Sequence, residues 1–116
     1  MAKTKVALAL GSGGARGLTQ IGAIEELEKS DFEIVSISGT SIGSLIGGLY
    51  ANNHLKEFKK WISNLDESGV FDLVDFTLNR QGFVKGERVF NEMKKFIPDA
   101  KIEELKIPFA AVTADL

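Results

Sequence analysis

The sequence predicts an α/β fold, a three-layer arrangement in which a mainly parallel sheet lies between helices on both faces. Two observations lead to this prediction: short apolar runs end in clusters of glycine and small residues, and segments with helical spacing follow them. Strands that alternate with helices need crossover connections, which make neighbouring strands parallel. The 116 residues, of which 44% are hydrophobic and 26% charged, suffice for one domain with a buried core.

The first half of the chain contains the order strand, glycine turn and helix twice. Residues 5–10 are a short apolar run that predicts a buried strand, and residues 33–38 predict a second one. Residues 41–51 are expected to form a helix that ends near an Asn-Asn pair. Residues 15–29 are expected to form an amphipathic helix, because apolar side chains recur every three positions, at Leu18, Ile21, Ile24 and Leu27.

The second half is predicted to add two helices, a long loop and a third strand. Residues 55–65 have helical spacing, whereas residues 69–85 have two glycines and no clean period, which indicates a long loop. Helical spacing returns over residues 86–97, and Pro98 ends it. Residues 107–113 predict the third strand. Because this core strand has no helix after it, the chain is expected to be the front part of a larger domain.

Charge and composition exclude several classes of partner and cofactor. The chain has 14 Lys and Arg against 16 Asp and Glu, so no surface for nucleic acid is expected. Without cysteine and with one histidine it offers neither a disulfide framework nor a set of metal ligands, and no cofactor is expected. Residues 1–10 do not have the pattern of a secretory leader, so the cytoplasm is the expected location. Residues 34–53 carry no charge, but their alternating serines favour a strand over a membrane span.

Residues 39–43, Gly-Thr-Ser-Ile-Gly, lie between a predicted strand and a predicted helix and have the pattern of a nucleophile elbow. In such a turn a strained backbone pushes the serine hydroxyl outward, and the chain passes too close for side chains at Gly39 and Gly43. Ser41 would then be the nucleophile, with the amide of Ile42 and the positive end of the helix facing an oxyanion. The alternative is a turn of small residues without chemistry.

The first glycine turn, residues 11–17, is expected to supply further amide donors. Successive glycines can turn their amides inward, and this turn follows a parallel strand, where sheets of this class place their sites. A phosphate-binding loop is excluded because Arg16 occupies the position of its second glycine. A dinucleotide-binding, Rossmann-like domain remains an alternative, although the third glycine is Gly17 rather than residue 16 and no acid ends the second strand.

Both turns, in this order, resemble those of the patatin-like phospholipases, above all their bacterial members. Residues 13–17, Gly-Gly-Ala-Arg-Gly, resemble the oxyanion segment of that family, and residues 39–44 resemble its elbow. Residues 107–115 are similar to the strand that follows the helical insertion in these proteins. The resemblance covers the whole chain and implies a serine hydrolase of lipid esters that uses a Ser-Asp dyad.

The same resemblance implies roles for individual residues. Ser41 would be the nucleophile, and the amides of Gly13 and Gly14 would hold the oxyanion. Arg16 would orient that loop or meet a lipid phosphate. Ser12 stands where many members have a further glycine, a position at which the bacterial branch often varies. The remaining small residues of the two turns would support the site: Gly11, Gly17, Gly39 and Gly43.

The second catalytic residue is harder to find. The partner aspartate of the family belongs to an Asp-Gly segment, and this sequence has no Asp-Gly dipeptide. Asp115 ends a predicted strand, but it matches a non-catalytic part of the family. His54 lies roughly 20 Å from Ser41 along a continuous helix, whereas a base must come within about 3 Å, so it is expected to be a helix-terminus residue. Glu87 and Arg88 are expected on a solvated helix face.

The sequence therefore predicts that residues 1–116 are the N-terminal part of a patatin-like phospholipase domain. Its expected partner is a lipid or ester substrate, with transient contact at a membrane surface and a location in the cytoplasm or at the membrane periphery. Because the dyad aspartate is missing, the chain alone is expected to hydrolyse esters feebly or not at all. A catalytically inactive relative that keeps the fold to bind lipid or a partner remains an alternative.

Overall fold

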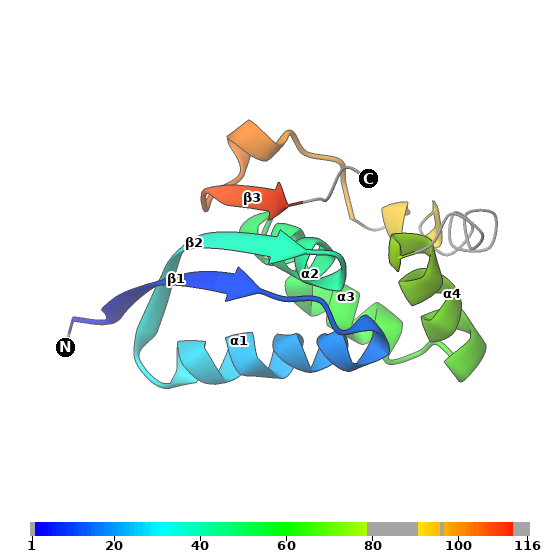
Figure 1. Ribbon diagram of the computed structural model, residues 1–116. Coiled ribbons are helices and arrows are strands. Elements are labelled where there is room, and N and C mark those ends of the chain that lie inside the picture. Colours follow the sequence, from blue (N-terminus) through cyan, green and yellow to red (C-terminus); the bar gives the residue numbers. More distant parts are fainter. Residues whose placement is uncertain (1, 79–90, 96, 113–116) are drawn as a thin grey trace.

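The computed structural model describes residues 2–78, 91–95 and 97–112 of the chain (Figure 1). In chain order the elements are β1 (Thr4–Leu10), η1 (Gly14–Thr19), α1 (Gln20–Lys29), β2 (Phe32–Thr40), α2 (Ile42–Ala51), α3 (Leu55–Ile62), α4 (Glu67–Leu78), η3 (Ile102–Glu104) and β3 (Phe109–Val112).

Within the described residues, β1, β2 and β3 form a parallel sheet with β2 in the centre. Leu10 at the end of β1 pairs with Gly39 near the end of β2, and Gly39 in turn pairs with Ala111 of β3. The register shifts between Val6 and Ala7. All three strands point the same way, so both glycine turns lie at the carboxyl ends of the strands, on the same side of the sheet (Figure 1).

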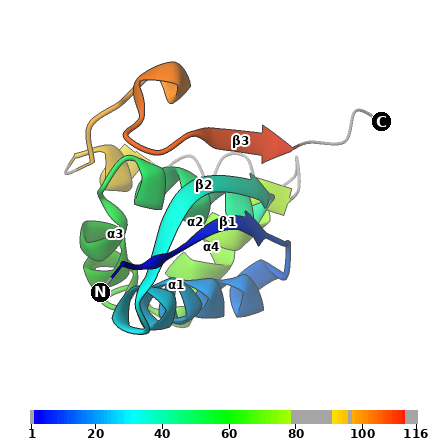
Figure 2. The same cartoon turned by 90° about the vertical axis from the view of Figure 1, so that its left-hand side faces the viewer.

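The hydrophobic core lies on one face of this sheet, under α1, α2 and α3. Figure 2 shows α2 behind β1 and β2, and α1 below them. The chain adds its strands in one direction, from β1 to β2 to β3, and right-handed crossovers then place both connections on the same face. The core residues include Leu10, Ile24, Ile34, Ile37, Ile46 and Phe58. The α/β class and the parallel sheet are confirmed, and the described residues form one of the two expected helical layers.

The opposite face of the sheet carries small side chains. Along β1, Ala7 and Ala9 are exposed and alternate with the core-facing leucines. In β2, Ser36 and Ser38 are their register partners and are half-buried. Ala110 of β3 pairs with Ser38 and is exposed. Toward the carboxyl ends of the strands this face is therefore uncharged, whereas the exposed pair Lys5 and Glu33 lies at its other end.

One predicted helix is divided in the structure, and another is described only in part. The expected helix over residues 15–29 is divided into η1 and α1, because the glycines of the first turn hold the chain in a tighter coil before α1 starts. Of the expected helix over residues 86–97, residues 91–94 are helical, and residues 86–90 and 96 lie outside the described residues.

The prediction of a loop over residues 69–85 is wrong for its first part, because α4 spans Glu67–Leu78. Asp66 starts this helix: its Oδ1 accepts a hydrogen bond of 2.7 Å from the amide of Gly69. Leu73 is fully buried and anchors the helix in the core. α4 lies beyond the carboxyl ends of the strands and packs against η1 (Figure 1).

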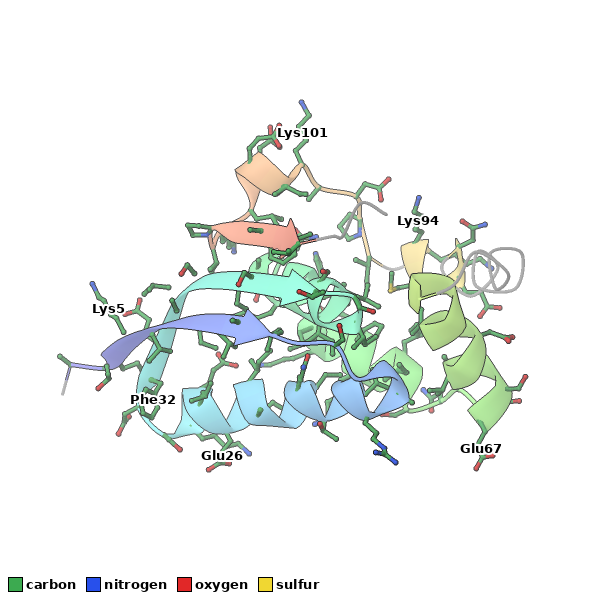
Figure 3. All side chains as sticks on the ribbon, viewed as in Figure 1. Lys5, Glu26, Phe32, Glu67, Lys94 and Lys101 are labelled. Carbon is green, nitrogen blue, oxygen red and sulfur yellow. The ribbon has the colours of Figure 1, made fainter. Side chains whose placement is uncertain are left out.

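Charged side chains lie on the outside of this arrangement. Figure 3 shows Glu26, Glu67 and Lys101 pointing away from the body of the protein, and all three are exposed. In the described ranges, no helix has both the length and the apolar character that crossing a membrane requires.

Candidate active site

Ser41 lies between the last residue of β2 and the first residue of α2, in an unusual backbone conformation. Its φ is 56° and its ψ is −125°, so a residue with a side chain occupies the region that favours glycine. Such a conformation costs on the order of 1–3 kcal/mol and persists only where the surroundings enforce it. The strand therefore turns sharply into the helix at this serine.

The glycines on either side of Ser41 allow this turn because the chain has no room for a β-carbon there. A Cβ at Gly39 would overlap the carbonyl group of Gly43. A Cβ at Gly43 would overlap the carbonyl oxygen of Leu10 and would lie 2.7 Å from that of Gly11. These are backbone atoms, which cannot move aside as the end of a flexible side chain can. The turn is thus packed directly onto the end of β1.

The first glycine turn lies against the same place. Gly13 has a φ of 151° and Gly14 a φ of 59°, both in the region that residues with side chains rarely adopt. The amide of Arg16 donates to the carbonyl of Gly13 at 3.2 Å and starts η1. A Cβ at Gly17 would overlap the Cγ2 atom of Ile42, the residue after Ser41. Two segments far apart in the sequence therefore meet at the carboxyl edge of the sheet (Figure 1).

The hydroxyl of Ser41 differs from the prediction. An oxygen pushed outward was expected, but Ser41 Oγ is buried and has no hydrogen-bond partner among the described residues. Ile42, the residue after Ser41, packs against Gly17 of the first turn. Leaving a buried hydroxyl unpaired costs about 1–3 kcal/mol.

Ser41 precedes the positive end of α2. The first amides of a helix have no acceptor within the helix, and they point toward the residue before it. The earliest turn of α2 is closed by the amide of Ser44, which donates to the carbonyl of Ser41 at 2.9 Å. The aligned peptide dipoles of α2 favour negative charge at this end. An oxyanion formed beside Ser41 would be stabilised here.

Two side chains that the sequence analysis did not single out hold the two turns. Gln20 Nε2 donates to the carbonyl of Gly11 at 2.9 Å, and Ser44 Oγ donates to the carbonyl of Gly39 at 2.7 Å. Each bond runs from the helix that follows a turn to the glycine that opens it. The sequence contains no signal for them, because the partner in each case is a backbone carbonyl that every residue has.

Two further candidates, His54 and Arg16, lie in the described part of the chain. His54 lies just before α3, beyond the far end of α2, and its Nδ1 is 3.6 Å from Glu57 Oε2. It stands at a helix terminus, as expected. Arg16 is exposed on η1. Asp115, Glu87 and Arg88 lie outside the described residues.

The chain is similar to known proteins over nearly all of its length. The family model for patatin-like phospholipase matches residues 8–115. An uncharacterised NTE family protein of Mycobacterium tuberculosis (strain H37Rv) is 38% identical over 112 residues, which are 97% of this chain and 31% of the relative.

Two eukaryotic proteins are similar over the same region. Human patatin-like phospholipase domain-containing protein 6 is 32% identical over 116 residues, covering 96% of this chain and 8% of its own length. Lysophospholipase NTE1 of Candida glabrata is 34% identical over 112 residues, covering 90% of this chain and 6% of its own length. The chain thus spans at most about a third of the length of these relatives. A family match over nearly all of its residues shows that the chain belongs to the patatin-like phospholipase family.

Proposed function

We propose that this chain carries the nucleophile and the oxyanion donors of a serine lipid acyl hydrolase, with Ser41 as the nucleophile. The observation that carries the proposal is the backbone of Ser41, held at a φ of 56° between β2 and α2 and packed onto the end of β1 through Gly43. A residue other than glycine is costly in that conformation, and the hydroxyl gives a chemical reason for it.

In the proposed reaction Ser41 Oγ attacks the carbonyl carbon of an ester and loses its proton to a base. The carbonyl oxygen becomes negative in the tetrahedral intermediate, where the amides of Gly13, Gly14 and Ile42 stabilise it. The intermediate collapses with loss of the alcohol, which takes up a proton, and leaves an acyl group on Ser41. Water then attacks this acyl-enzyme and releases the fatty acid.

The proposed base is an aspartate that this chain does not provide. The sequence has no Asp-Gly dipeptide, and Ser41 Oγ has no hydrogen-bond partner in the part of the chain that the structure describes. A serine without a base is a poor nucleophile near neutral pH, so these residues alone should hydrolyse esters very slowly.

The proposed substrate class is a phospholipid or lysophospholipid ester. The names of two relatives, a patatin-like phospholipase domain-containing protein and a lysophospholipase, support this class. The exposed Arg16 on η1 would orient the oxyanion loop or meet the lipid phosphate, and the protein would contact a lipid surface transiently to reach its substrate.

A fluorophosphonate probe tests the role of Ser41, since this strong electrophile can modify a serine beside oxyanion donors even where ester hydrolysis is very slow. Incubation followed by peptide mapping should place the label on Ser41, and Ser41→Ala should abolish labelling. Ser63→Ala is the matched control, because Ser63 is an exposed serine at the end of α3 and should have no influence. Labelling that survives in Ser41→Ala would disprove the proposed nucleophile.

Two other outcomes would favour the alternative functions. A protein that takes no label at all would be a binding module, and a rise in its melting temperature with added NAD would favour a dinucleotide site.

A further inference from the structure

We infer that Gln20 is a positioning residue that holds the first glycine turn at a fixed distance from Ser41, an inference that rests on the proposed function. Gln20 is the first residue of α1, and its Nε2 donates a hydrogen bond of 2.9 Å to the carbonyl of Gly11. Gly11 is the first residue after β1. The bond therefore closes the loop that has Gly13 and Gly14 at its centre.

The loop needs such a bond because glycines cannot fix its backbone by themselves. Gly13 and Gly14 have the most conformational freedom to lose, and both adopt positive φ values. The second half of the loop is held by the amide of Arg16 and by Thr19 Oγ1, which donates to the carbonyl of Arg16 at 2.8 Å. Gln20 provides the corresponding bond for the first half.

The carbonyl that Gln20 holds also faces the turn at Ser41. A Cβ at Gly43 would lie 2.7 Å from the oxygen of Gly11, so this carbonyl is already in close contact with the start of α2. Fixing Gly11 from one side by Gln20 and from the other by Gly43 fixes the separation of the two turns. The proposed oxyanion donors and the proposed nucleophile belong to those two turns.

The energetics of Gln20 indicate a role in geometry rather than in stability. Its Oε1 is buried and has no hydrogen-bond partner among the described residues. An unpaired buried acceptor costs at least as much as one intramolecular hydrogen bond contributes. The side chain thus gives little or no net stability, and an apolar residue of the same length should be tolerated by the fold.

Gln20→Met separates a role in positioning the first glycine turn from a role in stability, since methionine is similar in length but has no N–H donor. The melting temperature should stay unchanged. The rate constant of Ser41 modification by a saturating fluorophosphonate should fall by about ten- to a hundred-fold, with the half-saturating concentration unchanged, because small displacements of catalytic groups have effects of this size. Hydrogen exchange measured by mass spectrometry should become faster in residues 11–17 and stay the same in α3.

Ser63→Ala serves as the control, because it removes another bond from a side chain to a backbone carbonyl, Ser63 Oγ to Lys59, at 2.7 Å. It should change neither labelling nor exchange in residues 11–17. Unchanged labelling and exchange in Gln20→Met would overturn the inference, as would a loss of labelling that merely follows a lower melting temperature. If the protein without substitutions takes no label on Ser41, the proposed function fails. The hydrogen-exchange experiment still decides whether Gln20 fixes the first glycine turn.

Discussion

Gly43 is the residue at which the two glycine turns touch. A methyl group there would overlap the carbonyl oxygen of Leu10, which is backbone and part of the sheet edge. We expect Gly43→Ala to lower the free energy of unfolding by about 3 kcal/mol, the upper end of the range for overpacked positions. Urea unfolding followed by circular dichroism measures this change.

Gly22 provides the matched control for that substitution. It lies inside α1, and a Cβ there would meet nothing within 4 Å. Alanine has the higher helix propensity, so Gly22→Ala should raise the free energy of unfolding by about 0.5–1 kcal/mol. If the two substitutions changed the free energy of unfolding equally, the close contact between Gly43 and the end of β1 would be contradicted.

The backbone conformation of Ser41 is strained, so any residue other than glycine at this position should lower the stability of the protein. Ser41→Gly and Ser41→Ala both remove the hydroxyl, but only glycine adopts a φ of 56° without strain. We expect the glycine variant to be more stable than the alanine variant by about 1 kcal/mol, measured by thermal unfolding of the two proteins side by side. An alanine variant as stable as the glycine variant would contradict the strained turn.

At the scale of elements, one ion pair joins α1 to α3. Lys59 Nζ lies 2.8 Å from Glu25 Oε1 and 3.0 Å from Oε2, and this hydrogen bond lowers the pKa of Glu25 below its ordinary value. Because the folded pKa lies below the unfolded one, the pair contributes above the unfolded pKa and its contribution is lost as the pH falls through the folded pKa. The side chains of Lys59 and Glu25 are 51% and 35% exposed, so solvent screens the pair and its effect on stability is small.

Lys59→Met should therefore return the pKa of Glu25 toward its ordinary value. A titration of the Glu25 carboxyl carbon by NMR measures this shift directly. Lys60→Met is the control, because it removes a charge from the adjacent position of α3, and Lys60 is not among the groups that lower the pKa of Glu25. A shift of the same size in both variants would mean that net charge, and not the contact, sets this pKa.

The start of α4 depends on a cap that the pattern of apolar residues does not reveal. Asp66 Oδ1 accepts a hydrogen bond from the amide of Gly69, so Asp66→Ala should lower the free energy of unfolding by about 0.5–2 kcal/mol. Denaturant unfolding measures the loss, and Asp66→Asn, which keeps an acceptor at this position, should restore most of it. An alanine variant of unchanged stability would show that the cap contributes nothing.

At the scale of the whole molecule, the sheet has one face in the core and one face of small exposed side chains. Ala9→Lys should change the free energy of unfolding by less than about 0.5 kcal/mol, since Ala9 is exposed on the open face. Leu10→Lys should cost more than about 3 kcal/mol, because it places a charge among buried aliphatic side chains. Comparable losses in urea unfolding would mean that both faces are covered in solution.

The catalytic roles proposed for Ser41, Gly13, Gly14 and Ile42 remain predictions. Some of the features that arrange these residues could be predicted from the sequence, and others could not. The order of strand, glycine turn and helix was predictable because it follows from local spacing and from the steric needs of tight turns. The residues Gly39 and Gly43 were found for the same reason. Gln20 and Ser44 were not found, since a bond to a backbone carbonyl leaves no complementary residue type in the sequence.

The sequence by itself determined the α/β class, the places where the chain turns and the positions that must be glycine, because each depends on residues within a few positions of one another. Only the tertiary structure decided which face of the sheet the described helices cover, that α4 occupies the first part of the expected loop, and that the oxygen of Ser41 is buried. These features depend on contacts between segments distant in the chain. Packing of that kind arises when the strands are assembled, and no local pattern of residues specifies it.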